Sequence, residues 1–108
     1  MSDTPATPDR PAHPTVEVRD DPEHHRFQAV VDGEPAGHLD YELADGRVAL
    51  VGTHVPPAFE GRGVGSALVR RALDLVREAG DRTVDPVCPF VASWIDRHPD
   101  YRDLVAGR

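Results

Sequence analysis

From residue 60 the chain reads Glu60-Gly61-Arg62-Gly63-Val64-Gly65-Ser66-Ala67-Leu68. The three glycines of this segment alternate with other residues and lie between an apolar, strand-like run and a helical run. Glycine permits backbone conformations that are closed to other residues, and it lets a ligand approach the main chain closely. A helix that begins here presents unpaired N–H groups and the positive end of its dipole. The segment therefore predicts a site for a phosphate or pyrophosphate group.

The two flanks of the glycine segment differ in periodicity. Residues 48–55 are almost continuously apolar, as expected for a central strand that is covered on both faces, and Pro56-Pro57 end it. Residues 63 or 64 to 79 carry one apolar stripe at helical spacing, with charged residues largely outside it. Gly80 then provides a C-terminal stop for this helix.

The N-terminal half has the pattern of β-strands joined by tight turns. The sequence becomes strand-like from about Val16, and the run Phe27–Val31 meets a two-residue hairpin signal at Asp32-Gly33. Residues 38–43 alternate between polar and apolar, which is typical of a half-buried strand, and a second hairpin signal follows at Asp45-Gly46. We expect these strands and the apolar run after them to form an antiparallel meander.

The C-terminal part predicts one more strand and one more helix. A short strand over Thr83–Val87 ends at Cys88-Pro89, because a residue before proline is held in extended geometry. A helix from about Phe90 to His98 follows and is closed by Pro99. The long helix makes a right-handed crossover between two parallel strands. The predicted fold is therefore α+β: a three-stranded antiparallel meander, a β-α-β crossover and a C-terminal helix packed on the sheet.

Length and composition predict one domain. The chain has 108 residues, which suffices for a single modest core. Residues 1–14 contain four prolines among small polar residues and are expected to be a disordered leader, so the domain is predicted over residues 15–108.

The charge balance and the single cysteine restrict the classes of partner and compartment. The 12 Lys+Arg against 19 Asp+Glu give a formal net charge of −7, which argues against a nucleic-acid binder. No apolar run is long enough to span a membrane and no secretory signal is visible, so we expect no membrane partner. The lone Cys88 excludes an intramolecular disulfide, and we expect a cytoplasmic protein.

Two familiar phosphate loops do not fit. A P-loop needs Gly-Lys-Ser/Thr at its end, and this chain contains no lysine. A Rossmann fingerprint needs G-x-G-x-x-G in a larger parallel sheet, whereas the spacing here is G-x-G-x-G. The segment instead resembles the acetyl-coenzyme A loop of the GNAT superfamily of N-acetyltransferases, Gln/Arg-x-x-Gly-x-Gly/Ala. Gly63 and Gly65 match this motif, and Glu60 departs from its first position.

The wider text resembles a short-form GNAT family of roughly 100-residue proteins. The resemblance covers about residues 24 to 105, and its most specific parts are Cys88-Pro89-Phe90 and the ending His98-Pro99-Asp100-Tyr101. Glu before the glycines is common in that family. The resemblance implies an enzyme that uses acetyl-coenzyme A as co-substrate and acetylates a primary amine of a small molecule, a polyamine or a protein. It assigns the cofactor to Val55, Glu60, Gly61, Arg62, Gly63, Val64, Gly65 and Ser66.

The resemblance also implies where the chemistry takes place. In the GNAT fold the strands before and after the long helix splay apart and admit the pantetheine arm, which places His54 and Cys88 near the thioester from opposite sides. His54 is then a candidate general base, since an imidazole titrates near neutral pH, or a surface histidine at a strand end. Cys88 is a candidate acid or nucleophile, or a buried thiol without a reactive role. No metal site is expected.

A non-catalytic reading stays open. The resemblance implies a small member without the N-terminal helices that shape acceptor pockets in longer relatives, so an acyl-coenzyme A-binding or protein-interaction module is the alternative function.

Overall fold

The computed structural model describes residues 16–105 and confirms the predicted α+β fold. The expected leader, residues 1–14, lies outside the described residues, and the division of the chain into leader and single domain stays a prediction. None of the helices within residues 16–105 has the length and apolar character required to cross a bilayer.

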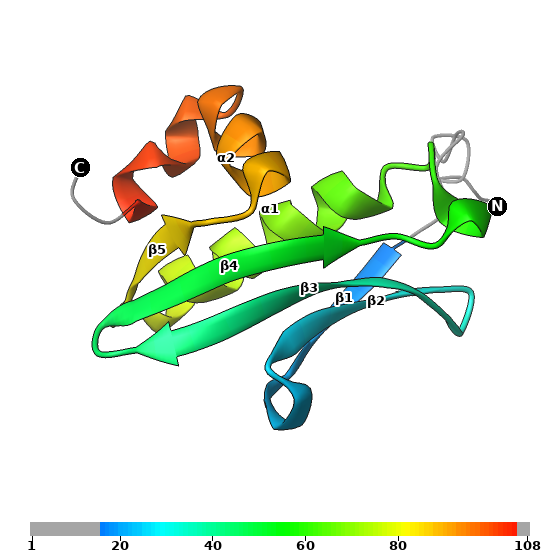
Figure 1. The fold of residues 1–108 in the computed structure, drawn as a ribbon, viewed down its shortest axis with the longest axis horizontal. Helices are drawn as coiled ribbons and strands as arrows, with labels where there is room; N and C mark the ends of the chain where they lie inside the picture. Colours follow the sequence, from blue (N-terminus) through cyan, green and yellow to red (C-terminus); the bar gives the residue numbers. More distant parts are fainter. Residues whose placement is uncertain (1–15, 106–108) are drawn as a thin grey trace, which may run out of the picture.

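Five strands form one sheet in the order β1-β2-β3-β4-β5 (Figure 1). The strands are β1 (Val16–Asp21), β2 (Arg26–Val31), β3 (Glu34–Ala44), β4 (Arg47–His54) and β5 (Thr83–Pro86). The first four pair antiparallel, and β5 runs parallel to β4. The meander contains one strand more than the three expected from the sequence, because the 3₁₀ turn η2 (Pro22–His24) divides the strand-like run after Val16.

The long helix α1 (Val64–Ala79) is flanked at both ends by glycines, whose backbone conformation would be strained for other residues. Gly63 and Gly80 both adopt the left-handed conformation, with φ of 79° and 74°. Between them the apolar stripe is buried against the sheet, where α1 packs on β1, β2 and β3. Figure 1 shows α1 running along one face of the sheet. Its N-terminus therefore lies at the end of the sheet where β4 stops.

The second helix, α2 (Pro89–Asp96), packs on β4 and β5 and leads into the 3₁₀ segment η4 (Pro99–Leu104). Trp94 is only 1% exposed and anchors this part of the core. Tyr101 hydrogen-bonds Asp74 of α1 at 2.8 Å, so η4 is tied to the long helix.

The pairing of β4 with its two neighbours ends at different places. Its pairing with β5 stops at Leu50 and Pro86, beyond which only the Cys88 N–H still donates to the Leu50 carbonyl, at 2.8 Å. Its pairing with β3 continues to His54, opposite His38. The last residues of β4 therefore have no strand on the β5 side, and the sheet opens there.

A β-bulge shifts the register within β4. Tyr41 pairs with Leu50, but Asp40 pairs with Gly52, so Val51 is an extra residue. A bulge of this kind exchanges the faces of all residues that follow it. Thr53 consequently lies opposite the buried Leu39, while Gly52 and His54 join the polar face of the sheet.

Candidate functional site

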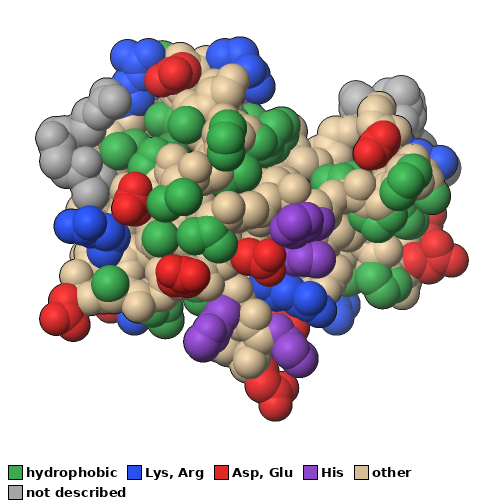
Figure 2. Space-filling view, in the orientation of Figure 1, with side chains coloured by type: hydrophobic (Ala, Val, Ile, Leu, Met, Phe, Trp, Pro, Cys, Tyr) green, Lys and Arg blue, Asp and Glu red, His purple; other side chains and the backbone are tan. Residues whose placement is uncertain are grey.

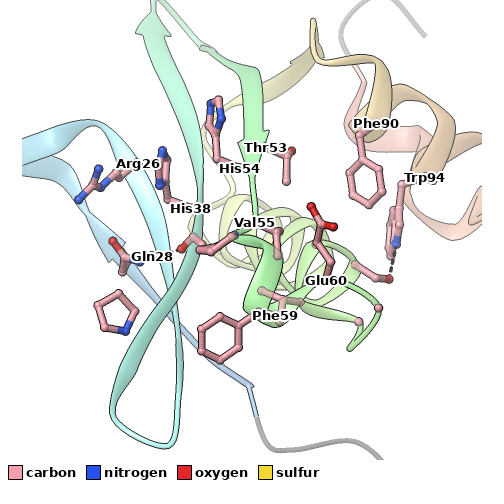
Figure 3. A pocket seen from close by; sticks show the side chains of 18 of the residues that line it. Arg26, Gln28, His38, Thr53, His54, Val55, Phe59, Glu60, Phe90 and Trp94 are labelled. Carbon is pink, nitrogen blue, oxygen red and sulfur yellow. Dashed lines mark hydrogen bonds between the residues drawn. The ribbon is translucent and has the colours of Figure 1, made fainter.

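A cleft of about 1000 Å³ surrounds the open end of β4 (Figure 3). One wall comes from β2, β3 and the end of β4, and the other from the loop after β4, the first turn of α1 and one side of α2. The lining residues named in the following paragraphs include Thr53, His54, Val55, Gly63, Phe90 and Trp94.

The glycine loop contributes free main-chain donors to this cleft. Gly61 and Gly63 have φ of 79°, and nothing lies within 4 Å of the position where a Cβ would stand. The first bond within the helix is donated by Ala67 to the Gly63 carbonyl. Among residues 16–105, the N–H groups of residues 61–66 have no hydrogen-bond acceptor. The loop and the start of the helix thus present a row of unpaired N–H groups to an anion.

Gly65 has a different role from the two glycines before it. Its backbone is helical, and a Cβ there would lie 3.2 Å from the Phe90 ring of α2. Phe90 is 40% exposed and stands over the helix start. Next to it the Trp94 indole N–H donates to the Ser66 hydroxyl at 2.8 Å, a bond drawn in Figure 3. Gly65 therefore allows α2 to close one side of the cleft.

Most of the cofactor residues expected from the sequence line the cleft. These are Val55, Glu60, Gly61, Gly63, Val64, Gly65 and Ser66. Arg62 is not among the lining residues, and its guanidinium lies over the Phe59 ring, 5.6 Å from the ring centre. The cations that do line the cleft are Arg26 and Arg97, which the sequence reasoning did not select.

His54 stands at the polar side of the cleft beside two residues of β3. Its Nε2 atom lies 3.3 Å from Asp40 Oδ2, and its ring centre lies 4.8 Å from that of His38. His38 Nε2 in turn lies 3.6 Å from Asp40 Oδ1. Partial burial holds the pKa of His38 below its ordinary value; Asp40 opposes this shift, whereas Arg26 and His54 reinforce it.

Cys88 is buried on the other side of β4, at the N-cap of α2, and is 6% exposed. Its Sγ atom lies 3.5 Å from the Thr53 hydroxyl oxygen. Burial raises the pKa of the thiol, but the nearby Thr53 hydroxyl and the backbone N–H groups of Val91, Phe90 and Thr53 outweigh it, so the pKa of Cys88 lies below its ordinary value. Thr53 lines the cleft, and Cys88 lies behind it.

The two predicted reactive side chains therefore do not meet. His54 contacts Asp40, whereas Cys88 contacts Thr53, and Figure 3 shows the Thr53 and His54 side chains pointing in different directions from β4. Sequence reasoning missed His38, Asp40 and Thr53. The alternation in β3 places His38 and Asp40 on one polar face, but only the strand register shows which residue of β4 lies opposite them.

The arrangement suits transfer of a group from an anionic carrier. Unpaired N–H groups at a helix start are suited to bind phosphate, the cleft extends along the end of β4 where its pairing with β5 has stopped, and a histidine beside a carboxylate is able to take up a proton.

A family model described as GCN5-related N-acetyl-transferase matches residues 26–104. This match covers both walls of the cleft. A comparison with curated proteins found no match.

Solved structures share the fold. The ribosomal-protein-S18-alanine N-acetyltransferase from Escherichia coli is 24% identical with a TM-score of 0.51, over 55% of this chain and 38% of that chain. A Thermoplasma acidophilum protein is 20% identical with a TM-score of 0.57, over 70% of this chain and 31% of that chain. An aminoglycoside N-acetyltransferase solved in complex with CoA is 19% identical with a TM-score of 0.51, over 85% of this chain and 90% of that chain. The chain thus spans less than half of the Escherichia coli and Thermoplasma acidophilum structures.

Proposed function

The chain belongs to the GCN5-related N-acetyltransferase family, and from this premise we propose that it transfers the acetyl group of acetyl-coenzyme A to a primary amine. The observation that carries the proposal is the row of unpaired N–H groups over residues 61–66, which faces a cleft at the point where β4 and β5 stop pairing. The acceptor is a small molecule, a polyamine or a protein amine.

The donor would bind with its pyrophosphate on the start of α1. Each charge-assisted hydrogen bond from the loop contributes about 1.5–3 kcal/mol, and the helix dipole adds about 0.3–1 kcal/mol. The pantetheine arm would then extend along the free side of β4, past Val55, toward Thr53. Coenzyme A bound in one structural neighbour supports this choice of donor.

The reaction would proceed by direct attack of the amine. The neutral amine nitrogen forms a bond to the thioester carbonyl carbon, His54 takes up the proton that the nitrogen loses, and the C–S bond breaks. The imidazolium would be stabilised by the Asp40 carboxylate, which lies 3.3 Å from Nε2. The departing thiolate would receive a proton from Cys88 through the Thr53 hydroxyl, which lies between the thiol and the cleft.

We also assign the chain to the short-form group of the family, on the strength of Cys88-Pro89-Phe90 and the His98-Pro99-Asp100-Tyr101 ending. In the structure these segments hold α2 and η4 in place. His98 stacks on Trp94 with ring centres 3.7 Å apart, and Cys88 is the N-cap residue of α2, whose carbonyl accepts from the Ala92 N–H at 3.0 Å. A cytoplasmic location stays a prediction that rests on the free thiol of Cys88.

The test has a binding half and a turnover half. Isothermal titration should show that acetyl-coenzyme A binds. Failure to bind at millimolar ligand would contradict the proposed donor. Release of free coenzyme A thiol should then depend on added amine. Binding without turnover across a panel of small amines, polyamines and peptides would favour the alternative of a non-catalytic acyl-coenzyme A-binding module.

Variants separate the proposed roles. His54→Gln should lower kcat by about 10²–10⁴-fold, as expected for loss of a general base, while the exposed His24→Gln outside the cleft should not. Mass spectrometry after incubation with labelled acetyl-coenzyme A would reveal an acetyl thioester on Cys88. Such an adduct would make Cys88 a nucleophile, and the proton-donor role would then be wrong.

A further inference from the structure

Three potential metal ligands converge on the polar face of β3 and β4, at one side of the cleft. They are His38 and Asp40 on β3 and His54 on β4, and their ligand atoms all lie within 4.8 Å of one another. The Asp40 carboxylate lies between the two rings, with Oδ1 facing His38 and Oδ2 facing His54. Figure 2 shows histidine side chains gathered beside acidic ones on this face of the molecule.

The distances are close to those of a tetrahedral zinc site. Zinc binds imidazole nitrogen and carboxylate oxygen at about 2.0–2.2 Å, which places neighbouring ligand atoms about 3.3–3.6 Å apart along a tetrahedral edge. His54 Nε2 lies 3.3 Å from Asp40 Oδ2 and His38 Nε2 lies 3.6 Å from Asp40 Oδ1, so each imidazole is at about this separation from one of the two carboxylate oxygens. The ligand atoms of the three residues all lie within 4.8 Å of one another, and the His54 side chain, 60% exposed, has room to adjust toward an ion.

The backbone holds these residues in place without any ligand. Both strands lie inside the sheet, and His38 is paired with His54 across them. Gly52, which pairs with Asp40, leaves the space that the His54 ring occupies. A Cβ at Gly52 would lie 3.2 Å from His54 Nε2.

The ring nitrogens of the pair are not engaged elsewhere. Within residues 16–105 neither the His38 nor the His54 side chain makes a hydrogen bond, although both rings lie near a carboxylate. His24 and His98 differ, because each directs Nδ1 to an oxygen at 2.9 Å or 2.7 Å. Lone pairs on His38 and His54 are thus available to a cation.

We propose that His38, Asp40 and His54 form a binding site for one divalent transition-metal ion of the zinc class. Two imidazole nitrogens and one carboxylate oxygen suit Zn²⁺, Co²⁺ or Ni²⁺, whereas Mg²⁺ and Ca²⁺ prefer oxygen ligands throughout. Three protein ligands leave the fourth position open toward the cleft, for water or a ligand. The sequence predicted no metal site, because these residues come together only through the register of β3 and β4.

Two neighbouring groups were compared with the site. Arg26 is paired with Asp40 across β2 and β3, but its nearest carboxylate oxygen is Asp21 Oδ2, 3.8 Å from Nε, so Arg26 does not occupy the Asp40 carboxylate. A second group, Asp21, Glu23 and His24, offers only one imidazole, and that ring already binds Asp21. His24 therefore supplies a control for non-specific metal binding.

Metal binding itself does not depend on the proposed acetyl transfer. Inhibition of acetyl transfer by the metal is a consequence that does rest on the proposed function, because an ion on Nε2 would tie up the proposed base. Metal affinity is therefore measured without donor or acceptor, so that the two proposals fail separately.

The experiment uses the full chain without a polyhistidine tag, stripped of metal by dialysis against a chelator. Zn²⁺ affinity is measured by competition with a chromogenic chelator, and Co²⁺ replaces Zn²⁺ for visible spectroscopy. We expect one equivalent and the intense d–d absorption of a four- or five-coordinate ion. His38→Ala, His54→Ala and Asp40→Asn should each weaken binding by more than about tenfold, since loss even of outer-shell partners costs 10–100-fold.

The controls give each result a meaning. His24→Ala should leave the affinity unchanged, and Gly52→Ala should weaken it by crowding the His54 ring. Asp40→Asn alters charge with little change in volume and so keeps the test valid if an alanine variant does not fold. The proposal is overturned if wild type fails to bind at millimolar metal, if the three ligand variants bind as tightly as wild type, or if His24→Ala removes the binding.

Discussion

Replacement of Gly37 by alanine tests how closely β3 approaches the end of β4. Gly37 has φ of +139°, a conformation that L side chains rarely adopt. An added Cβ would lie 2.6 Å from the His54 carbonyl oxygen and 3.3 Å from the Val55 Cα. Both of these atoms belong to the main chain, so no side-chain rotation relieves the overlap. The end of β4, which carries one wall of the cleft, would have to move.

Two penalties add in this variant. The backbone conformation costs about 1–3 kcal/mol for a residue other than glycine. Overpacking against a fixed neighbour costs about 1–3 kcal/mol more. Gly37→Ala should therefore lower the free energy of unfolding by roughly 2–6 kcal/mol, a large part of the roughly 5–15 kcal/mol that stabilises a domain. At about 4–8 °C per kcal/mol for a small domain, the loss in Tm should be at least about 8 °C.

Gly33→Ala is the matched control. Gly33 also has positive φ, +81°, but nothing lies within 4 Å of its added Cβ. It should show only the conformational penalty, about 1–2 kcal/mol. Thermal unfolding followed by circular dichroism gives the stability of both variants, and titration at a temperature where both are folded gives their affinity for acetyl-coenzyme A. Only Gly37→Ala should bind the donor more weakly. Equal loss of Tm in the two variants would refute the close approach.

Two further predictions concern groups with shifted pKa. Thr53→Val removes the hydroxyl beside Cys88 and should therefore raise the pKa of the thiol. The pH dependence of the alkylation rate of Cys88 should then have a higher midpoint, whereas Thr53→Ser should keep the wild-type midpoint. An unchanged midpoint in Thr53→Val would contradict the role of the hydroxyl. Arg77 donates to Asp103 at 2.9 Å and 3.0 Å and lowers the pKa of that carboxyl. The pair therefore stabilises the fold above about pH 4, and this contribution is lost as the pH falls through the lowered pKa of Asp103. Arg77→Ala should therefore lower Tm at pH 7 and differ less from wild type in acid, whereas Arg71→Ala, whose nearest carboxylate oxygen is 3.5 Å away, should have little effect at either pH. A difference for Arg77→Ala that does not shrink in acid would show that the ion pair is not its cause.

The sequence was sufficient to predict the bounds of those elements whose ends are determined by the backbone conformation of single residues. The helix predicted to begin at residue 63 or 64 and to end at residue 79 spans Val64–Ala79, because the glycines at both ends adopt left-handed conformations that end a helix. The loop before it was predicted as an anion site for the same local reason. The additional strand β1 was not separated from β2, since the turn between them carries Pro22 but no glycine hairpin signal.

The site could be predicted only in part, because its polar half depends on contacts between strands. His54 was selected because the family resemblance places it near the thioester, but its neighbours His38 and Asp40 are 16 and 14 residues away in sequence. Cys88 was expected near the thioester, and the structure places it behind Thr53, as the N-cap of α2. No periodicity within one segment contains this information.

The bulge at Val51 explains why the contacts of His54 and of Thr53 could not be predicted from the sequence and why the two halves of the site are linked. Without it, the alternation that buries Val48 and Leu50 would continue, and His54 would point toward the buried side while Thr53 pointed to the polar face. With one extra residue, Thr53 lies opposite Leu39 and reaches Cys88, and His54 lies opposite His38 and reaches Asp40. A single irregularity in β4 thus places the proposed proton donor and the proposed base on different sides of one strand. That strand is also the one along which the thioester would lie, so the two groups can act on opposite sides of the same bond without contacting each other.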